Sequence, residues 1–190
     1  MPEKITVRER VCPWWMCYTF DNPLRRLIHN PEAILSPYVK AGQRIIDIGP
    51  GMGYFTIPLA RKVGPSGHVT AIDVQEKMLI ALNRRAEKYG VSEIISTCLA
   101  SPDSLGAHLP VDFVLAFWMV HEVPDKKRFF DEVHNLLKPD GLFLIVEPAI
   151  HVHENYFLKT LETAKDAGFL VKETPKIRMS RSALLMKTEK

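Results

Sequence analysis

Residues 45–53 read Ile-Ile-Asp-Ile-Gly-Pro-Gly-Met-Gly, and this stretch decides the fold class. The apolar residues around Asp47 predict a buried parallel strand. Glycines then recur at every second position, where the lack of a Cβ allows a tight turn and a close approach to a ligand. Residues 54–61 predict a helix directly after these glycines, so the loop lies at a helix N-terminus. A strand, a glycine loop and a helix together predict a nucleotide-type cofactor site.

The spacing of the glycines does not fit the dinucleotide pattern G-x-G-x-x-G. The third glycine of that pattern would fall at Tyr54 when counted from Gly49, and at Thr56 when counted from Gly51. The pattern present is D-x-G-x-G-x-G, which begins at Asp47. The cofactor is therefore expected to be something other than a dinucleotide.

A second signal is Asp73, which ends the apolar strand predicted over residues 67–73. It follows Gly53 by 20 residues, and an acid at this distance hydrogen-bonds the ribose hydroxyls in nucleotide-binding α/β folds. A carboxylate suits this role because it accepts two O–H donors at once. The alternative is that Asp73 only caps the helix predicted over residues 75–89.

The rest of the chain continues the alternation of strands and helices. Further strands are predicted over residues 93–99, 111–117, 142–147, 169–173 and 182–186, and further helices over 125–137 and 153–167, with residues 138–141 stopping the first of these helices. The last two strands have no helix between them, which favours an antiparallel hairpin. We therefore predict an α/β fold with a doubly wound, seven-stranded Rossmann-like sheet, mostly parallel and closed by an antiparallel C-terminal hairpin.

The glycine loop resembles the first motif of the class I S-adenosylmethionine-dependent methyltransferases. Three further patterns extend the resemblance over about residues 31–187. Residues 136–141, Leu-Leu-Lys-Pro-Asp-Gly, are similar to the family's "LLKPGG" corner, and the closing hairpin matches its last two strands. Residues 120–125, Val-His-Glu-Val-Pro-Asp, resemble the segment after the fourth strand in ubiquinone-biosynthesis-like and arsenite-methyltransferase-like members. The resemblance implies an enzyme that uses S-adenosyl-L-methionine as its cofactor.

The resemblance also implies a set of cofactor-binding residues. Gly49, Gly51 and Gly53 would lie against the amino acid and ribose parts of the cofactor. Asp47 would orient the loop and help to hold the ammonium group, and Asp73 would bind the ribose hydroxyls. The other expected contacts are Val74 and Met78 beside the adenine, the backbone of Phe117, and Ser101 or a backbone group where the family often has an acid after the third strand. An ordinary amphipathic helix position is the alternative for Met78.

Residues 1–40 are expected to form an N-terminal cap segment over the substrate cleft, and residues 41–190 the cofactor-binding domain of a single globular unit. The segment around Cys12, Cys17 and Tyr18 is rich in aromatic residues, so these three side chains are candidate substrate contacts within a lid. The spacing of the two cysteines is a weak metal signal, and no second pair completes a zinc set. No metal site is predicted from it.

Three histidines follow predicted strands: His121 follows the fourth, and His151 and His153 follow the fifth. Ligands in open α/β sheets bind beyond the carboxyl ends of the strands, which favours a place for these histidines in the substrate pocket. A hydroxyl acceptor would need a base, and histidine suits that task, with His121 as first choice and the other two as second. Together with the two thiols they could bind a soft metal or metalloid. The alternative is that each is an isolated surface or cap residue.

Composition limits the remaining function classes. The chain has 190 residues and a net charge of +3, with its basic residues in short scattered clusters that favour solvated helix faces over a nucleic-acid surface. No apolar run approaches the ~20 residues of a membrane span, and the N-terminus lacks the apolar core of a secretion signal. The odd cysteine count, which includes Cys98 in a predicted buried strand, favours a reducing compartment and a cytoplasmic protein.

We therefore predict methyl transfer from S-adenosylmethionine to a small-molecule acceptor, with thiol, metalloid or quinol-type acceptors favoured. The alternatives are methylation of a protein or RNA, and a cofactor-binding module without catalysis. The acceptor atom and the oligomeric state stay open at this point.

Overall fold

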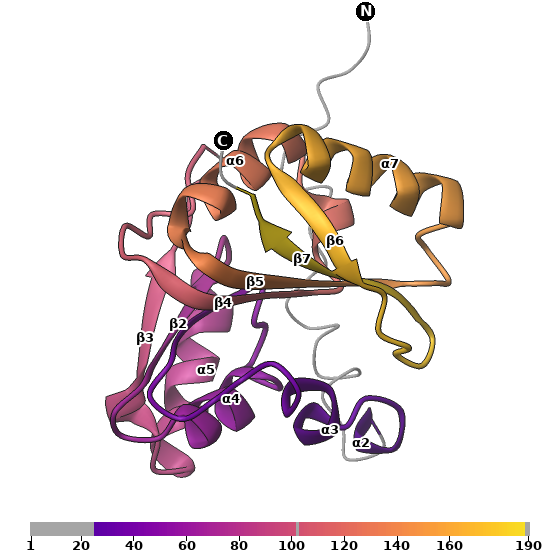
Figure 1. Cartoon of the computed structure of the whole chain (residues 1–190). Coiled ribbons are helices and arrows are strands. Elements are labelled where there is room, and N and C mark those ends of the chain that lie inside the picture. Colours follow the sequence, from indigo (N-terminus) through magenta and orange to yellow (C-terminus); the bar gives the residue numbers. More distant parts are fainter. Residues whose placement is uncertain (1–24, 102, 189–190) are drawn as a thin grey trace, which may run out of the picture.

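The computed structural model describes residues 25–101 and 103–188 of the chain, and its frame is one seven-stranded sheet (Figure 1). The strands are β1 (Arg44–Ile48), β2 (His68–Asp73), β3 (Ile95–Leu99), β4 (Val111–Phe117), β5 (Leu137–Pro148), β6 (Phe169–Glu173) and β7 (Ser180–Lys187). Their order is β3-β2-β1-β4-β5-β7-β6, with parallel pairing from β3 to β5 and antiparallel pairing of β7 with both neighbours. The predicted fold class and the C-terminal hairpin are confirmed.

Helices lie on both faces of the sheet (Figure 1). The elements are α2 (Arg25–Ile28), α3 (Pro31–Leu35), α4 (Thr56–Val63), α5 (Glu76–Lys88), α6 (Lys126–Leu136) and α7 (Glu154–Asp166), with 3-10 turns η3 (Ser92–Ile94) and η4 (Val120–Glu122). On one face α4 and α5 pack against the strands β1 to β3, and α3 packs on α4. On the other face α6 and α7 pack against each other and against β5 and β6.

The sheet has one apolar core on each face, and the side chains of β1, which point alternately to the two faces, contribute to both cores. Ile45 belongs to the buried cluster that contains Leu59 and Leu82, on the α4 and α5 side. Its neighbour Ile46 belongs to the cluster that contains Phe130, on the α6 and α7 side. Successive side chains of a strand point to opposite faces, so a strand covered on both faces needs a continuous apolar run. Because β1, β2, β4 and β5 are parallel, their carboxyl ends meet along one edge of the sheet, where the site is built.

One boundary differs from the sequence-based expectation. Residues 138–141 were expected to separate helix from strand, but β5 begins at Leu137, directly after α6. Leu137 is buried and pairs with Val111, whereas Leu142 pairs with Phe113, so the turn residues form a bulge inside the strand. The burial of Leu137 explains why β5 begins at this residue. In an exposed turn the apolar side chain of Leu137 would lie in water, which is unfavourable.

Candidate functional site

The three glycines of the loop after β1 all adopt the left-handed backbone conformation, with φ of +68° at Gly49, +55° at Gly51 and +88° at Gly53. Their surroundings differ. A Cβ added at Gly49 would lie 2.9 Å from the Cβ of Met119, and one added at Gly53 would lie 3.2 Å from the Cγ of Leu82. A Cβ at Gly51 would meet no protein atom within 4 Å. The first and last glycines therefore serve packing, while the middle one offers bare backbone to a ligand.

Two buried carboxyl groups flank this loop. Asp47 is 2% exposed and accepts a hydrogen bond from Thr56 Oγ1 at 2.6 Å. Asp73, at the end of β2, is 8% exposed and accepts from the backbone N–H of Gln75 at 2.8 Å. The backbone N–H groups of Gly51 and Val74 also donate to Asp73. Asp73 therefore ties the middle of the glycine loop to the end of the neighbouring strand.

Burial changes the acidity of both groups. Burial, together with the charge of Asp73, raises the pKa of Asp47 to about 7, against the hydrogen bond from Thr56. Burial raises the pKa of Asp73 to about 6, against its backbone donors. Two acids with raised pKa values beside an open loop attract a cationic or hydroxyl-bearing ligand, because such a ligand stabilises their charged form.

The chain leaves β4 through a strained residue. Trp118 has a φ of +62°, which is costly for a bulky side chain. Its backbone N–H donates to Val146 O at 2.6 Å, and its indole Nε1 donates to Ser180 Oγ at 3.0 Å. This conformation places Met119, the next residue, against Gly49. The segment after β4 is thus fixed beside the glycine loop.

A histidine–carboxylate pair follows on the same edge. Glu147, near the end of β5, is 1% exposed, and its Oε1 accepts from the backbone N–H of Val120 at 3.0 Å. Its Oε2 accepts from the backbone N–H of His121 at 3.0 Å and lies 2.8 Å from the imidazole Nδ1. A carboxylate requires the proton on Nδ1, which leaves Nε2 as the basic nitrogen. Glu147 therefore sets both the position and the tautomer of His121.

The charge of Glu147 also changes the basicity of His121. Burial lowers the pKa of His121, but the hydrogen bond and negative charge of Glu147, together with Glu122, outweigh burial and raise the net pKa above 6.5. The imidazole side chain remains 23% exposed, so it is accessible from solvent. This arrangement can accept a proton from a neighbouring hydroxyl group.

The structure does not bring the other two histidines into this pair. His151 and His153 are exposed on the turn between β5 and α7. Neither side chain hydrogen-bonds to another described residue, and within the described ranges no group of three or more His, Cys, Asp or Glu residues could hold a metal ion. Cys12, Cys17 and Tyr18 lie outside the described residues, so their predicted substrate contacts stay predictions.

The remaining predicted cofactor residues occupy varied positions. Val74 is 44% exposed directly after Asp73, and Met78 is buried in α5. Ser101 is exposed, and its Oγ accepts from the backbone N–H of Asp103 at 3.3 Å. Phe117 is buried at the end of β4. Their contacts with adenine or the amino acid end remain predictions.

Comparison with known proteins decides the family. A family described as a methyltransferase domain matches residues 39–183. The chain belongs to this methyltransferase domain family. The resemblance stated from the glycine loop is thereby confirmed, and S-adenosylmethionine is the cofactor of the domain.

The sequences and structures similar to this methyltransferase domain include other methyltransferases. A demethylmenaquinone methyltransferase of Lactobacillus johnsonii is 35% identical over 114 residues, which cover 57% of this chain and 45% of the relative. An arsenite methyltransferase of Halobacterium salinarum is 29% identical over 119 residues, covering 59% and 28% respectively. The match thus spans less than half the length of these curated relatives. A solved structure of a SAM-dependent methyltransferase from Aquifex aeolicus has a TM-score of 0.83 at 23% identity, covering 94% of this chain and all of that one, and it shows the same fold.

The residues of the methyltransferase domain fit this cofactor. The open space at Gly51 admits a ligand to bare backbone, and a buried carboxylate at Asp73 can accept two ribose O–H donors. Asp47 lies behind the loop, within electrostatic reach of Asp73. When bound, S-adenosylmethionine supplies a methyl group on a positively charged sulfur.

We expect Asp73→Asn to weaken the binding of S-adenosylmethionine by about 10- to 100-fold, because a charge-assisted hydrogen bond contributes about 1.5–3 kcal/mol. Asparagine keeps one oxygen for the backbone donors, so the loop should survive. Calorimetric titration measures the dissociation constant, with the exposed Asp103→Asn as the control. Unchanged affinity in Asp73→Asn would show that the ribose assignment is wrong.

Sequence reasoning missed two parts of the site. Glu147 was placed only in a strand, although an acid inside a buried strand is the same signal that identified Asp47 and Asp73. The strain at Trp118 has no signal in the sequence, because its neighbours in space are far along the chain.

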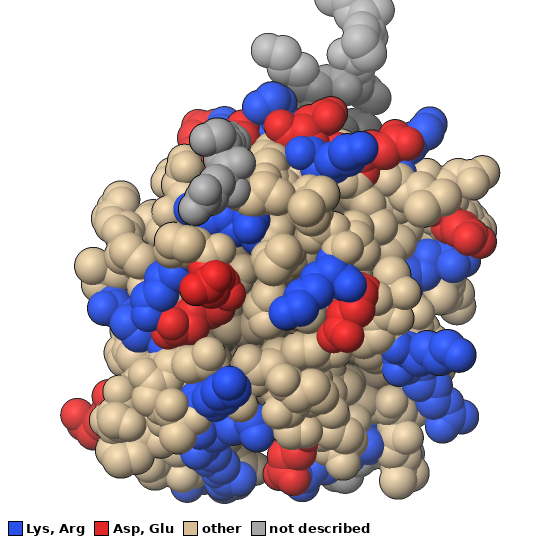
Figure 2. Space-filling model, in the orientation of Figure 1, with Lys and Arg blue, Asp and Glu red and all other residues tan. Residues whose placement is uncertain are grey.

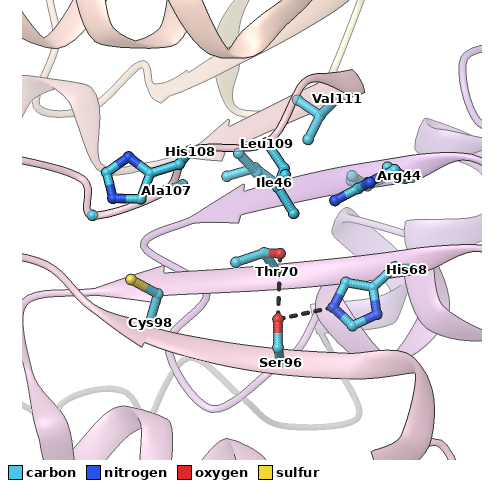
Figure 3. Close-up of a pocket in the computed structure, with 12 residues that line it drawn as sticks. Arg44, Ile46, His68, Thr70, Ser96, Cys98, Ala107, His108, Leu109 and Val111 are labelled. Atoms are coloured by element: carbon cyan, nitrogen blue, oxygen red, sulfur yellow. Dashed lines mark hydrogen bonds between the residues drawn. The ribbon is translucent and has the colours of Figure 1, made fainter.

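A cavity of about 210 Å³ lies apart from the glycine loop, over one face of β1, β2 and β3 (Figure 3). Cys98 lines it, half-buried and packed against the core; the strand around it was expected to be buried, but β3 is only partly buried because it lies at the edge of the sheet. The described residues between β3 and β4 form no helix over this part of the sheet. The floor is polar: Ser96 Oγ lies 2.9 Å from His68 Nε2 and donates to Thr70 Oγ1 at 3.3 Å.

Proposed function

We propose that this chain transfers the methyl group of S-adenosylmethionine to a small-molecule acceptor, and that a quinol-type hydroxyl is the favoured acceptor class. The observation that carries this choice is the His121–Glu147 pair beside the glycine loop. A thiolate or a metalloid with a lone pair needs no proton removed at the moment of attack, whereas a hydroxyl does. A buried carboxylate that orients one imidazole is therefore useful chiefly for a hydroxyl acceptor.

The chain's own residues divide the work of this reaction. The glycine loop and Asp73 bind and orient the cofactor, and alignment of the two reactants can contribute about 7–11 kcal/mol of the lowering of the barrier. His121 Nε2 takes the acceptor proton, and Glu147 stabilises the imidazolium that results. The surrounding apolar side chains, including Phe117, exclude water from the site.

Relatives and surface charge support a small acceptor. The names of relatives include demethylmenaquinone methyltransferase and ubiquinone biosynthesis O-methyltransferase, the latter 31% identical over 113 residues in Paramagnetospirillum magneticum. Figure 2 shows basic and acidic side chains interspersed over one face of the molecule, without the continuous basic stripe typical of nucleic-acid binding. None of the helices in the described ranges is long and apolar enough to cross a membrane.

The test compares acceptors in the parent chain and in His121→Asn. We expect the variant to lose about 10²- to 10⁴-fold in the rate of hydroquinone methylation, because that is the usual contribution of a positioned base. Its affinity for S-adenosylmethionine should be unchanged. His151→Asn and His153→Asn are the matched controls, since they replace the two exposed candidates.

The pH profile gives an independent readout. A base must be neutral, and the pKa of His121 is raised, so hydroquinone methylation should rise with pH through a value above 6.5. Equal activity of all three histidine variants would contradict the proposal. Activity toward thiols or arsenite alone, unaffected by His121→Asn, would assign the chain to another acceptor class.

A further inference from the structure

The floor of the cavity over β1, β2 and β3 is formed by side chains that alternate along these strands and share one face of the sheet. Between β1 and β2, Arg44 pairs with His68, and Ile46 pairs with Thr70. Thr70 pairs in turn with Ser96 of β3. Arg44 and His68 therefore lie at one end of the cavity, while Ile46 and Thr70 lie near its middle (Figure 3).

The end of the cavity at Arg44 carries one net positive charge. The carboxylate of Asp112 is already balanced, because Lys138 Nζ lies 2.6 Å from its Oδ1, and Arg44 adds a second positive charge nearby. Within the described residues the guanidinium of Arg44 forms no hydrogen bond or ion pair. Burial and the charge of Arg44 lower the pKa of His68, so this imidazole is neutral at pH 7. An anionic ligand would balance the charge that remains.

A chain of hydrogen bonds along the floor leaves one donor for a ligand. Ser96 Oγ donates to Thr70 Oγ1 at 3.3 Å, which uses the single proton of the serine. The contact of 2.9 Å between Ser96 Oγ and His68 Nε2 then requires the proton on Nε2. The Thr70 hydroxyl accepts in this chain, and its own proton has no acceptor among the residues that the structure describes. Thr70 can therefore donate to an anionic oxygen near Arg44.

Most of the remaining lining is apolar and has room for one ring. It includes Ile46, Ala107, Leu109 and Val111. An apolar cavity of about 150 Å³ holds benzene, and this cavity measures about 210 Å³, which leaves space for a small polar group. Leu109 is 59% exposed, so a bound ring would remove part of its apolar surface from water.

We propose that this cavity binds a single-ring aromatic carboxylate. The carboxylate accepts hydrogen bonds from the guanidinium of Arg44 and the hydroxyl of Thr70, and the ring lies against Ile46 and Leu109. Neither His121 nor any glycine of the loop after β1 lines the cavity. The site is therefore separate from the place of methyl transfer, and its occupation does not depend on the proposed function.

The test titrates the full chain with three probes, using calorimetry in the presence of saturating S-adenosylhomocysteine, the demethylated form of the cofactor. Benzoate carries both the ring and the charge, benzyl alcohol carries the ring alone, and acetate carries the charge alone. We expect one saturable site for benzoate and at least about 10-fold weaker binding of the other two probes, because each lacks one of the two matched parts. Omitting S-adenosylhomocysteine should leave the benzoate constant within about twofold.

Substitutions in the cavity test the two donors. Arg44→Met should weaken benzoate binding about 10-fold or more, and Thr70→Val, which keeps the branched shape, about 3- to 10-fold. Arg84→Met is the matched control and should change nothing. Arg84 is an exposed arginine of α5, and this helix packs on the opposite face of the sheet.

A third variant, Ala107→Phe, tests the space itself. Its added ring would occupy the cavity from the connection between β3 and β4, so it should abolish benzoate binding without altering a strand. This variant keeps the test decisive if Arg44→Met fails to fold, which thermal unfolding would show.

Several outcomes would overturn the proposal. Benzoate binding that is unchanged in Arg44→Met or in Ala107→Phe would place the ligand elsewhere. Equal binding of benzyl alcohol and benzoate would mean that the charge is not recognised, and equal binding of acetate and benzoate would mean that the ring is not. A parent chain that binds no benzoate would exclude the site.

Discussion

Gly51→Ala is expected to reduce the affinity for S-adenosylmethionine by about 30-fold or more, because a Cβ at this position would hold the cofactor away from the loop backbone, and the loss of two hydrogen bonds costs about 1–3 kcal/mol each. The fold itself should tolerate the change. An added Cβ at Gly51 meets no protein atom within 4 Å, so the only cost to folding is the left-handed φ of +55°, about 1–2 kcal/mol. Calorimetric titration and thermal unfolding measure the two effects separately.

Gly90→Ala is the matched control for this variant. Gly90 has a φ of +66° and equally open surroundings, but it lies after α5, away from the glycine loop. It should show the same loss of stability with unchanged cofactor affinity. Equal affinity in the two variants would mean that the open space at Gly51 is not where the cofactor binds.

Asp47→Asn is expected to raise the free energy of unfolding at pH 8. The folded-state pKa of Asp47 is about 7, above its ordinary value of 3.8, so the protonated acid favours folding. That contribution is full below about pH 4 and is lost as pH rises to about 7, a change on the order of 4 kcal/mol for three pKa units. Asparagine carries no such proton, so chemical unfolding of this variant should vary less between pH 4 and 8. Asp73, with a pKa of about 6, contributes in the same direction and remains.

Asp112→Asn should behave in the opposite way. Burial raises the pKa of Asp112, but hydrogen bonds from Lys138 and from the backbone N–H of Arg44 outweigh burial and lower the net pKa. A lowered pKa stabilises the fold at neutral pH and loses that effect in acid, so this variant should be less stable than the parent at pH 8. Stability that falls in both variants at pH 8 would contradict the burial argument for Asp47.

The glycine loop and its acids could be predicted because their signals are local. Asp47 and Gly49 lie within one strand and turn, and Asp73 lies at a fixed distance along the chain. The alternation of apolar runs and helical spacings likewise gave the fold class. The order of the strands has no such local signal. Nothing in the sequence near Cys98 shows that β3 lies at the edge of the sheet, so the partial exposure of β3 could not be predicted.

The other site groups depend on contacts between distant residues. His121 could be chosen from its place after a strand, but its partner Glu147 is 26 residues further on, and only the pairing of β4 with β5 brings them together. Likewise the guanidinium of Arg25, in α2, lies between the ring of Tyr54, which follows the glycine loop, and that of Trp118, which follows β4. Local patterns predict elements, while such clusters arise from the packing of those elements.

The hydrogen bond from His29 to Arg178 spans 149 residues. During synthesis the glycine loop and both acids leave the ribosome long before Arg178 does, and contacts of such long separation form late in folding. The packing of the segment around His29 is therefore completed after most of the sheet has formed. A chain that ends before Arg178 would contain the whole glycine loop but would lack the acceptor of the His29 hydrogen bond, so residues near Arg178 complete the packing of a segment encoded far earlier in the sequence.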